Sequence, residues 1–92
     1  MSCLKFIIFG QVQGVYYRKY VSQAMNKKSF KGFIKNLEDG SVETVLQNTD
    51  SLNIKDIFDI LYEGSPKSIV KSVEMVECKE SVEFKNLFEV RY

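Results

Sequence analysis

The segment from Gly10 to Arg18 combines residue types that could hold a phosphoryl or carboxylate group. Its two glycines, Gly10 and Gly14, permit a tight loop in which several backbone N–H groups point at one spot. The helix expected after the loop adds the positive end of its dipole. Arg18 offers a planar guanidinium group that matches the oxygens of a phosphate. We therefore expect an anion cradle here. The simpler alternatives are a tight turn and a surface arginine paired with a carboxylate.

Hydrophobic patterning places this loop between a strand and a helix. The short run from Leu4 to Phe9 is rich in aromatic and β-branched residues, which predicts a strand. Beyond the loop, apolar residues recur at helical spacing and predict a helix over about residues 16–27. Strands are then expected at 32–37 and at 42–47. The Asp39-Gly40 pair between them is typical of a tight hairpin turn.

The second half of the chain repeats the pattern. An apolar stripe predicts a helix that begins near Ile54, with N-cap candidates at 49–51, and that is ended by Gly64 and Pro66. Further strands are expected at 69–78 and 88–92. The resulting βαββαβ order predicts an α+β, ferredoxin-like sandwich: an antiparallel sheet with two helices on one face and a short extra C-terminal strand.

Composition limits the classes of protein. Ninety-two residues suit a single domain spanning 1–92. With 13 basic and 12 acidic residues and a net charge of +1, the chain lacks the basic excess of most nucleic-acid-binding proteins. No apolar stretch approaches the ~20 residues needed to span a bilayer. Cys3 and Cys78 could form one disulfide, but without a larger cysteine framework we expect free thiols in a reducing compartment. We therefore expect a cytoplasmic monomer that binds neither nucleic acid nor membrane.

Two stretches of the chain resemble the signatures of the acylphosphatase family. The residues from Gly10 to Arg18 match its first signature, G-x-V-Q-G-V-x-[FY]-R, throughout. The residues from Gly32 to Asn36, followed by a turn containing Gly40, match its second signature. The resemblance covers essentially the whole chain, and the two signatures occur in the right order and separation.

The resemblance implies an enzyme that hydrolyses the carboxyl–phosphate bond of acyl phosphates and releases inorganic phosphate, which also competes for the site. It implies that Arg18 holds the phosphate oxygens and that Asn36 orients the attacking water. It further implies that the phosphate lies on the backbone N–H groups of Gln13, Gly14, Val15, Tyr16 and Tyr17. No metal and no other cofactor is expected.

The residue types agree with this chemistry on independent grounds. The chain has no histidine, the usual acid or base at neutral pH. The amide of Asn36 is not basic and can only position a water molecule through hydrogen bonds. One arginine, one amide and several N–H donors suit phosphoryl transfer, which needs mainly positioning and charge stabilisation. Without an evident general acid the leaving group must depart unaided. A carboxylate can do so because the pKa of its acid is about 4.

Three other interpretations stay open. A relative of the family could retain the anion cradle without catalysis, or the domain could belong to a larger carbamoyl-transfer maturation protein. An RNA-recognition domain shares the βαββαβ order, and Lys31-Gly32-Phe33 begins like its base-stacking motif. The motif fails at once, because Lys35 stands where the next stacking aromatic belongs.

Overall fold

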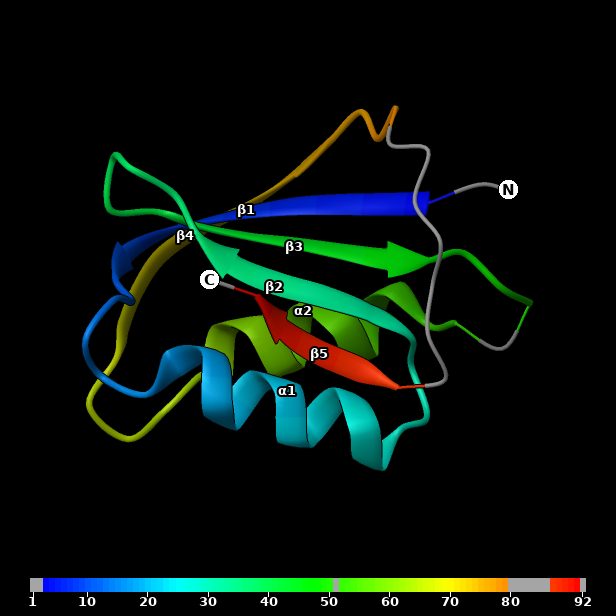
Figure 1. The fold of residues 1–92 in the computed structure, drawn as a ribbon, viewed down its shortest axis with the longest axis horizontal. Coiled ribbons are helices and arrows are strands. Elements are labelled where there is room, and N and C mark those ends of the chain that lie inside the picture. Colours follow the sequence, from blue (N-terminus) through cyan, green and yellow to red (C-terminus); the bar gives the residue numbers. More distant parts are fainter. Residues whose placement is uncertain (1–2, 51, 80–86, 92) are drawn as a thin grey trace.

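Five strands and two helices follow one another in the predicted order (Figure 1). The structure is a computed structural model that describes residues 3–50, 52–79 and 87–91. The elements are β1 (Cys3–Gln11), α1 (Tyr17–Lys27), β2 (Gly32–Asn36), β3 (Val42–Gln47), α2 (Ile54–Glu63), β4 (Ile69–Val76) and β5 (Phe88–Arg91). In the described ranges neither helix has the length and apolar character that a bilayer crossing requires.

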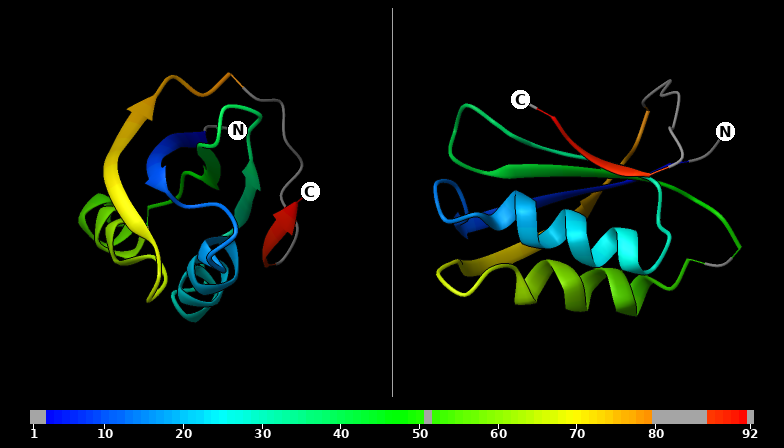
Figure 2. Two further views of the ribbon diagram at one scale, coloured as in Figure 1. Left: turned by 90° about the vertical axis from the view of Figure 1, so that its left-hand side faces the viewer. Right: turned by 60° about the horizontal axis from the view of Figure 1, so that its bottom comes forward.

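The sheet has the strand order β4-β1-β3-β2-β5. The pairs β1–β4, β1–β3 and β2–β3 are antiparallel, whereas β5 runs parallel to β2. The ferredoxin-like class is confirmed, but the sheet is mixed and not wholly antiparallel as predicted. The difference arises because β4 and β5, although consecutive strands of the chain, lie on opposite edges of the sheet (Figure 2, left).

Both helices cover the same face of the sheet, and the core lies between the two layers (Figure 2, right). On β1 the alternate residues Phe6 and Ile8 point inward, as the two-residue period of a strand requires. On α1 the inward residues are Tyr17, Val21 and Met25, spaced four apart along one helical face. Packing of these helix residues against these strand residues fixes the position of α1 relative to β1.

Helix α2 is capped by a residue that the sequence analysis did not single out. The side chain of Asn53 accepts hydrogen bonds from the backbone N–H groups of Lys55 (2.9 Å) and Asp56 (3.4 Å). The prediction of an N-cap at 49–51 was wrong for Thr49 and Asp50, and Ser51 lies outside the described residues. Asparagine serves as an N-cap as well as aspartate or serine does, so residue type alone did not distinguish these candidates.

Cys3 and Cys78 form a disulfide, so the prediction of free thiols was wrong. Their sulfur atoms are 1.98 Å apart and their Cα atoms 5.8 Å apart. The β1–β4 pairing sets Lys5 opposite Val76. Continuing that antiparallel register by two residues on each strand brings the two cysteines face to face. The sequence could not reveal this juxtaposition, because it depends on which strands become neighbours.

Reduction of this disulfide is expected to lower stability and to leave the loop of Gly10–Arg18 intact. The bridge joins residues 75 apart, and a crosslink over so long a loop stabilises a small domain by about 2–5 kcal/mol. Chemical unfolding with and without a reductant measures the loss, and the Cys3→Ser/Cys78→Ser variant is the control that should not respond to reductant. Two titratable thiols in the folded, air-exposed protein would contradict this expectation.

Candidate active site

The loop between β1 and α1 has an unusual backbone. Gly14 (φ 74°) and Tyr16 (φ 61°, ψ 22°) both adopt left-handed conformations. Glycine does so at little cost, but a left-handed tyrosine stores on the order of 1–3 kcal/mol of strain. Left-handed residues alternating with ordinary ones turn successive N–H groups toward a common centre and make a concave anion site. The strain at Tyr16 is therefore consistent with a loop shaped to bind.

The N–H groups of this loop are not used in holding the fold together. Within residues 3–50, 52–79 and 87–91, none of the N–H groups from Gln13 to Tyr17 donates to a backbone carbonyl or to a side chain. The N-cap residue, Tyr16, supplies no side-chain cap to α1. Such donors at the start of a helix attract anions, both through hydrogen bonds and through the helix dipole.

Two side-chain hydrogen bonds tie the loop to the segment around the end of α2. Ser65, which is buried, donates from Oγ to the carbonyl oxygen of Val15 at 2.6 Å. The buried hydroxyl of Tyr17 donates to the carbonyl oxygen of Leu61, also at 2.6 Å. Burial raises the pKa of Tyr17 well above its usual range, so this hydroxyl stays a neutral donor. In both bonds a side-chain hydroxyl donates to a backbone carbonyl oxygen. Neither bond therefore occupies an N–H group of the loop.

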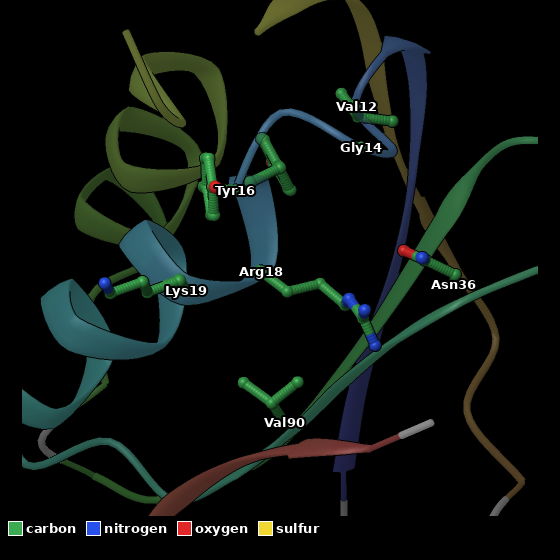
Figure 3. A pocket seen from close by; sticks show the side chains of 8 residues that line it. Val12, Gly14, Tyr16, Arg18, Lys19, Asn36 and Val90 are labelled. Carbon is green, nitrogen blue, oxygen red and sulfur yellow. The ribbon is translucent and has the colours of Figure 1, made fainter. Parts of the chain in front are cut away.

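A pocket of about 520 Å³ opens beside this loop (Figure 3). It contains five of the seven residues predicted for the site: Gly14, Tyr16, Tyr17, Arg18 and Asn36. The other two, Gln13 and Val15, belong to the same loop but do not line the pocket. Figure 3 shows the side chains of Arg18 and Asn36 pointing toward one another from α1 and β2. Two residues 18 positions apart in the chain thus face the same space as the loop.

Arg18 is held in place from the far edge of the sheet. It lies in the first turn of α1, where a cation is unfavourable to the helix dipole by about 0.3–1 kcal/mol. Its Nη1 donates to the carbonyl oxygen of Arg91, on β5, at 2.8 Å. This contact fixes the guanidinium group at the pocket. An anion bound between the loop and Arg18 would reverse the unfavourable interaction with the helix.

Asn36 lines the pocket and carries a buried acceptor without a described partner. It is the last residue of β2, directly before the turn to β3. Its Oδ1 is buried, and none of the described residues donates a hydrogen bond to it. Leaving a buried polar atom without a partner costs about 1–3 kcal/mol, so such atoms are rare in folded proteins. An acceptor of this kind, set opposite a guanidinium group, is suited to hold a water molecule.

The pocket also has walls that sequence reasoning missed. Val12 and Val90 line it, as does the exposed residue Lys19. Val12 is buried. Val90 reaches the pocket because β5 pairs parallel with β2, which sets Val90 opposite Ile34. No pattern in the sequence identified that pairing, and Lys19 could not be distinguished from the other lysines of the chain.

Comparison with known proteins shows which family the chain resembles. The model of the acylphosphatase family matches residues 4–90. The chain is 34% identical over 89 residues to an acylphosphatase of Borrelia garinii subsp. bavariensis, covering 96% of each chain. It is 35% identical over 74 residues to one of Dehalococcoides mccartyi, covering 80% of this chain and 81% of that protein.

Solved structures agree with these relatives. The acylphosphatase of Bacillus subtilis superposes with a TM-score of 0.82 over all of both chains, at 29% identity. That of Coxiella burnetii gives 0.78 at 34% identity, covering 98% of this chain and 92% of the other. Family and fold together support an acylphosphatase enzyme, and the family model covers nearly the whole chain. The chain belongs to the acylphosphatase family.

Proposed function

We propose that the pocket beside Gly14 hydrolyses acyl phosphates to a carboxylate and inorganic phosphate. The observation that carries the proposal is the convergence of three groups on one pocket: the loop with its unused N–H donors, Arg18 and the unsatisfied oxygen of Asn36. Each alone has a simpler explanation. Together they supply a site for an anion and, next to it, a site for a water molecule.

In this mechanism the phosphoryl group of the substrate lies on the N–H groups of Gln13 to Tyr17. Arg18 donates to its oxygens with two parallel N–H groups, which is the geometry that gives charge-assisted bonds their strength. In the transition state, negative charge is spread over the three phosphoryl oxygens that the bond-breaking leaves in place. Fixed donors that need no reorganisation then stabilise the transition state more than the ground state. The loop and Arg18 thus both bind the substrate and accelerate its reaction.

The attacking water is held by the amide of Asn36. Oδ1 accepts a hydrogen bond from the water, which directs a lone pair of the water oxygen at phosphorus. A new P–O bond forms as the bond from phosphorus to the carboxylate oxygen breaks, and the carboxylate leaves with that electron pair. The water proton passes to a phosphate oxygen, so a dianionic acyl phosphate and water give a carboxylate and dihydrogen phosphate. Positioning of this kind, together with charge stabilisation, is the main contribution of enzymes to phosphoryl transfer.

The reaction selects its substrates through the leaving group. Nothing proposed for this site protonates the departing oxygen. A carboxylate departs unaided because the pKa of its acid is about 4, whereas an alkoxide does not. We therefore expect hydrolysis of benzoyl phosphate and acetyl phosphate, competitive inhibition by inorganic phosphate, and no turnover of a simple alkyl phosphate. Because no metal takes part in these steps, a chelator should leave the rate unchanged.

A direct assay tests this proposal. Phosphate release from benzoyl phosphate and from an alkyl phosphate is compared at equal enzyme concentration, with and without a chelator. The proposal requires turnover of benzoyl phosphate alone. Equal rates with both substrates would show that the leaving group is protonated by the enzyme, which the mechanism excludes. Phosphate binding without any turnover would identify the alternative, a non-catalytic anion-binding relative.

The surroundings of Phe33 bear on the RNA-binding alternative. The ring of Phe33, the aromatic of the partial RNA-binding motif, is buried, and the Arg91 guanidinium carbon lies 3.9 Å from its centre. It therefore offers no free face for a stacked base, which argues against an RNA-binding role.

The cytoplasmic location and the monomeric state stay predictions. A disulfide such as Cys3–Cys78 is unusual in a reducing compartment.

A further inference from the structure

The side chain of Gln13 links the two halves of the pocket. Its Nε2 donates to the carbonyl oxygen of Leu37 at 2.8 Å and to that of Ser41 at 2.9 Å. Both acceptors are backbone carbonyls, which cannot donate, so the group that faces them must be the NH₂ of the amide. Gln13 immediately precedes Gly14 in the loop, and Leu37 immediately follows Asn36.

This link connects the loop after β1 with the end of β2, two segments that do not pair directly in the sheet. In the strand order, β3 separates β1 from β2. The loop after β1 and the end of β2 therefore have no ladder of hydrogen bonds between them at this point. The amide of Gln13 reaches across to the turn between β2 and β3 and bonds to both of its ends.

The two acceptors are already part of the turn. The Ser41 carbonyl also accepts from the N–H of Leu37 (2.9 Å), and the Leu37 carbonyl accepts from the N–H of Gly40 (3.3 Å). The N–H and hydroxyl of Ser41 both donate to Asp39, which lowers the pKa of the Asp39 carboxyl. The turn is thus closed by its own bonds and does not need Gln13 to form. The bonds from Gln13 serve to place it relative to the loop.

We propose that Gln13 is a positioning residue that sets the distance between the bound phosphoryl group and the water held by Asn36. This inference rests on the proposed function. The loop holds phosphorus and Asn36 holds the attacking oxygen, and a misplacement of about 1 Å between reacting groups costs on the order of 100-fold in rate. The effect of Gln13 must therefore fall on the chemical step and not on phosphate binding, which needs the loop and Arg18 only.

The test uses Gln13→Leu, which removes both donors, and Gln13→Glu, which keeps the size but presents a carboxylate to two carbonyls. Gln23→Leu, at an exposed position on α1, is the control. For both Gln13 variants we expect kcat on benzoyl phosphate to fall by about 10- to 100-fold. The inhibition constant of inorganic phosphate should change by less than about threefold. Gln23→Leu should match the wild type in both.

Two further measurements separate positioning from a loss of stability. In an Asn36→Ala background, Gln13→Leu should cost less than about threefold in kcat, because residues that act through one another are not additive. With Gln13→Glu, kcat relative to the wild type should rise as the pH falls and the carboxyl regains a proton to donate. Unfolding curves confirm that the assayed variants are folded.

The outcomes distinguish the two proposals. Wild-type turnover with Gln13 variants of normal kcat would overturn this inference and leave the proposed function standing. The same holds if the losses from Gln13→Leu and Asn36→Ala simply multiply. A wild-type protein that binds phosphate but does not hydrolyse benzoyl phosphate would overturn both.

Discussion

Replacing Arg18 with alanine is expected to cost about 2–4 kcal/mol of transition-state stabilisation on benzoyl phosphate, which is roughly 30- to 1,000-fold in kcat/KM. The guanidinium group is the one side-chain cation that Figure 3 shows directed at Asn36 across the pocket. The Arg91 carbonyl, on a strand at the edge of the sheet, holds it there. Arg18→Lys should also lose most activity, because lysine keeps the charge but lacks the planar fork.

Lys27→Ala is the matched control for Arg18→Ala. It removes the same unit of charge from the same helix, at an exposed position in the last turn and outside the pocket. If the loss in Arg18→Ala came only from the general attraction of anions to the protein, the two variants would behave alike. A value of kcat/KM in Arg18→Ala within about threefold of the wild type would remove this residue from the mechanism.

Replacing Asn36 with alanine is expected to lower kcat by about 100-fold, while the inhibition constant of inorganic phosphate stays close to that of the wild type. In the proposed mechanism phosphate contacts the loop and Arg18, whereas Asn36 contacts only the water. The stability of this variant should hold or rise, because the substitution removes a buried oxygen that has no partner among the described residues. Steady-state kinetics and unfolding curves measure the two quantities on one sample.

Asn48→Ala provides the comparison for Asn36→Ala. Asn48 directly follows the last residue of β3. It is exposed and does not line the pocket. Normal turnover by Asn36→Ala would show that another group orients the water. A weakened affinity for phosphate with normal kcat would place Asn36 on the phosphate and not on its attacker.

Much of the fold could be predicted because local patterns and the global structure agree. The apolar run at 4–9 and the helical spacing beyond the loop predicted β1 and α1, which span Cys3–Gln11 and Tyr17–Lys27. The Asp39-Gly40 pair predicted the turn between β2 and β3, which the structure closes with a hydrogen bond from Leu37 to Ser41. These features depend on residues close together in the chain, and the two family signatures coincide with them.

What could not be predicted depends on long-range pairing. The disulfide follows from β1 and β4 becoming neighbours, and the parallel β2–β5 pair follows from β5 joining the far edge of the sheet. That second pairing brings Val90 to the pocket and the Arg91 carbonyl to Arg18.

The same limit applied to the loop itself. Gln13 was predicted to hold the phosphate through its backbone N–H alone, because the partners of its side chain lie 24 and 28 residues away. Periodicity carries no information about contacts at that separation. The left-handed backbone at Tyr16 was equally unexpected, since a tyrosine rarely adopts it without a surrounding structure that enforces it.

The most direct test of the account is a titration of the protein with inorganic phosphate, followed by NMR through the amide N–H signals. We expect the largest shifts at the amides of residues 13–17 and at the guanidinium N–H of Arg18, with saturation at the concentration that inhibits hydrolysis of benzoyl phosphate. The signals of the helix-end residues Lys27 and Glu63 should not move. Inhibition by phosphate with unchanged loop amides, or with the largest shifts on another face of the molecule, would contradict the central claim.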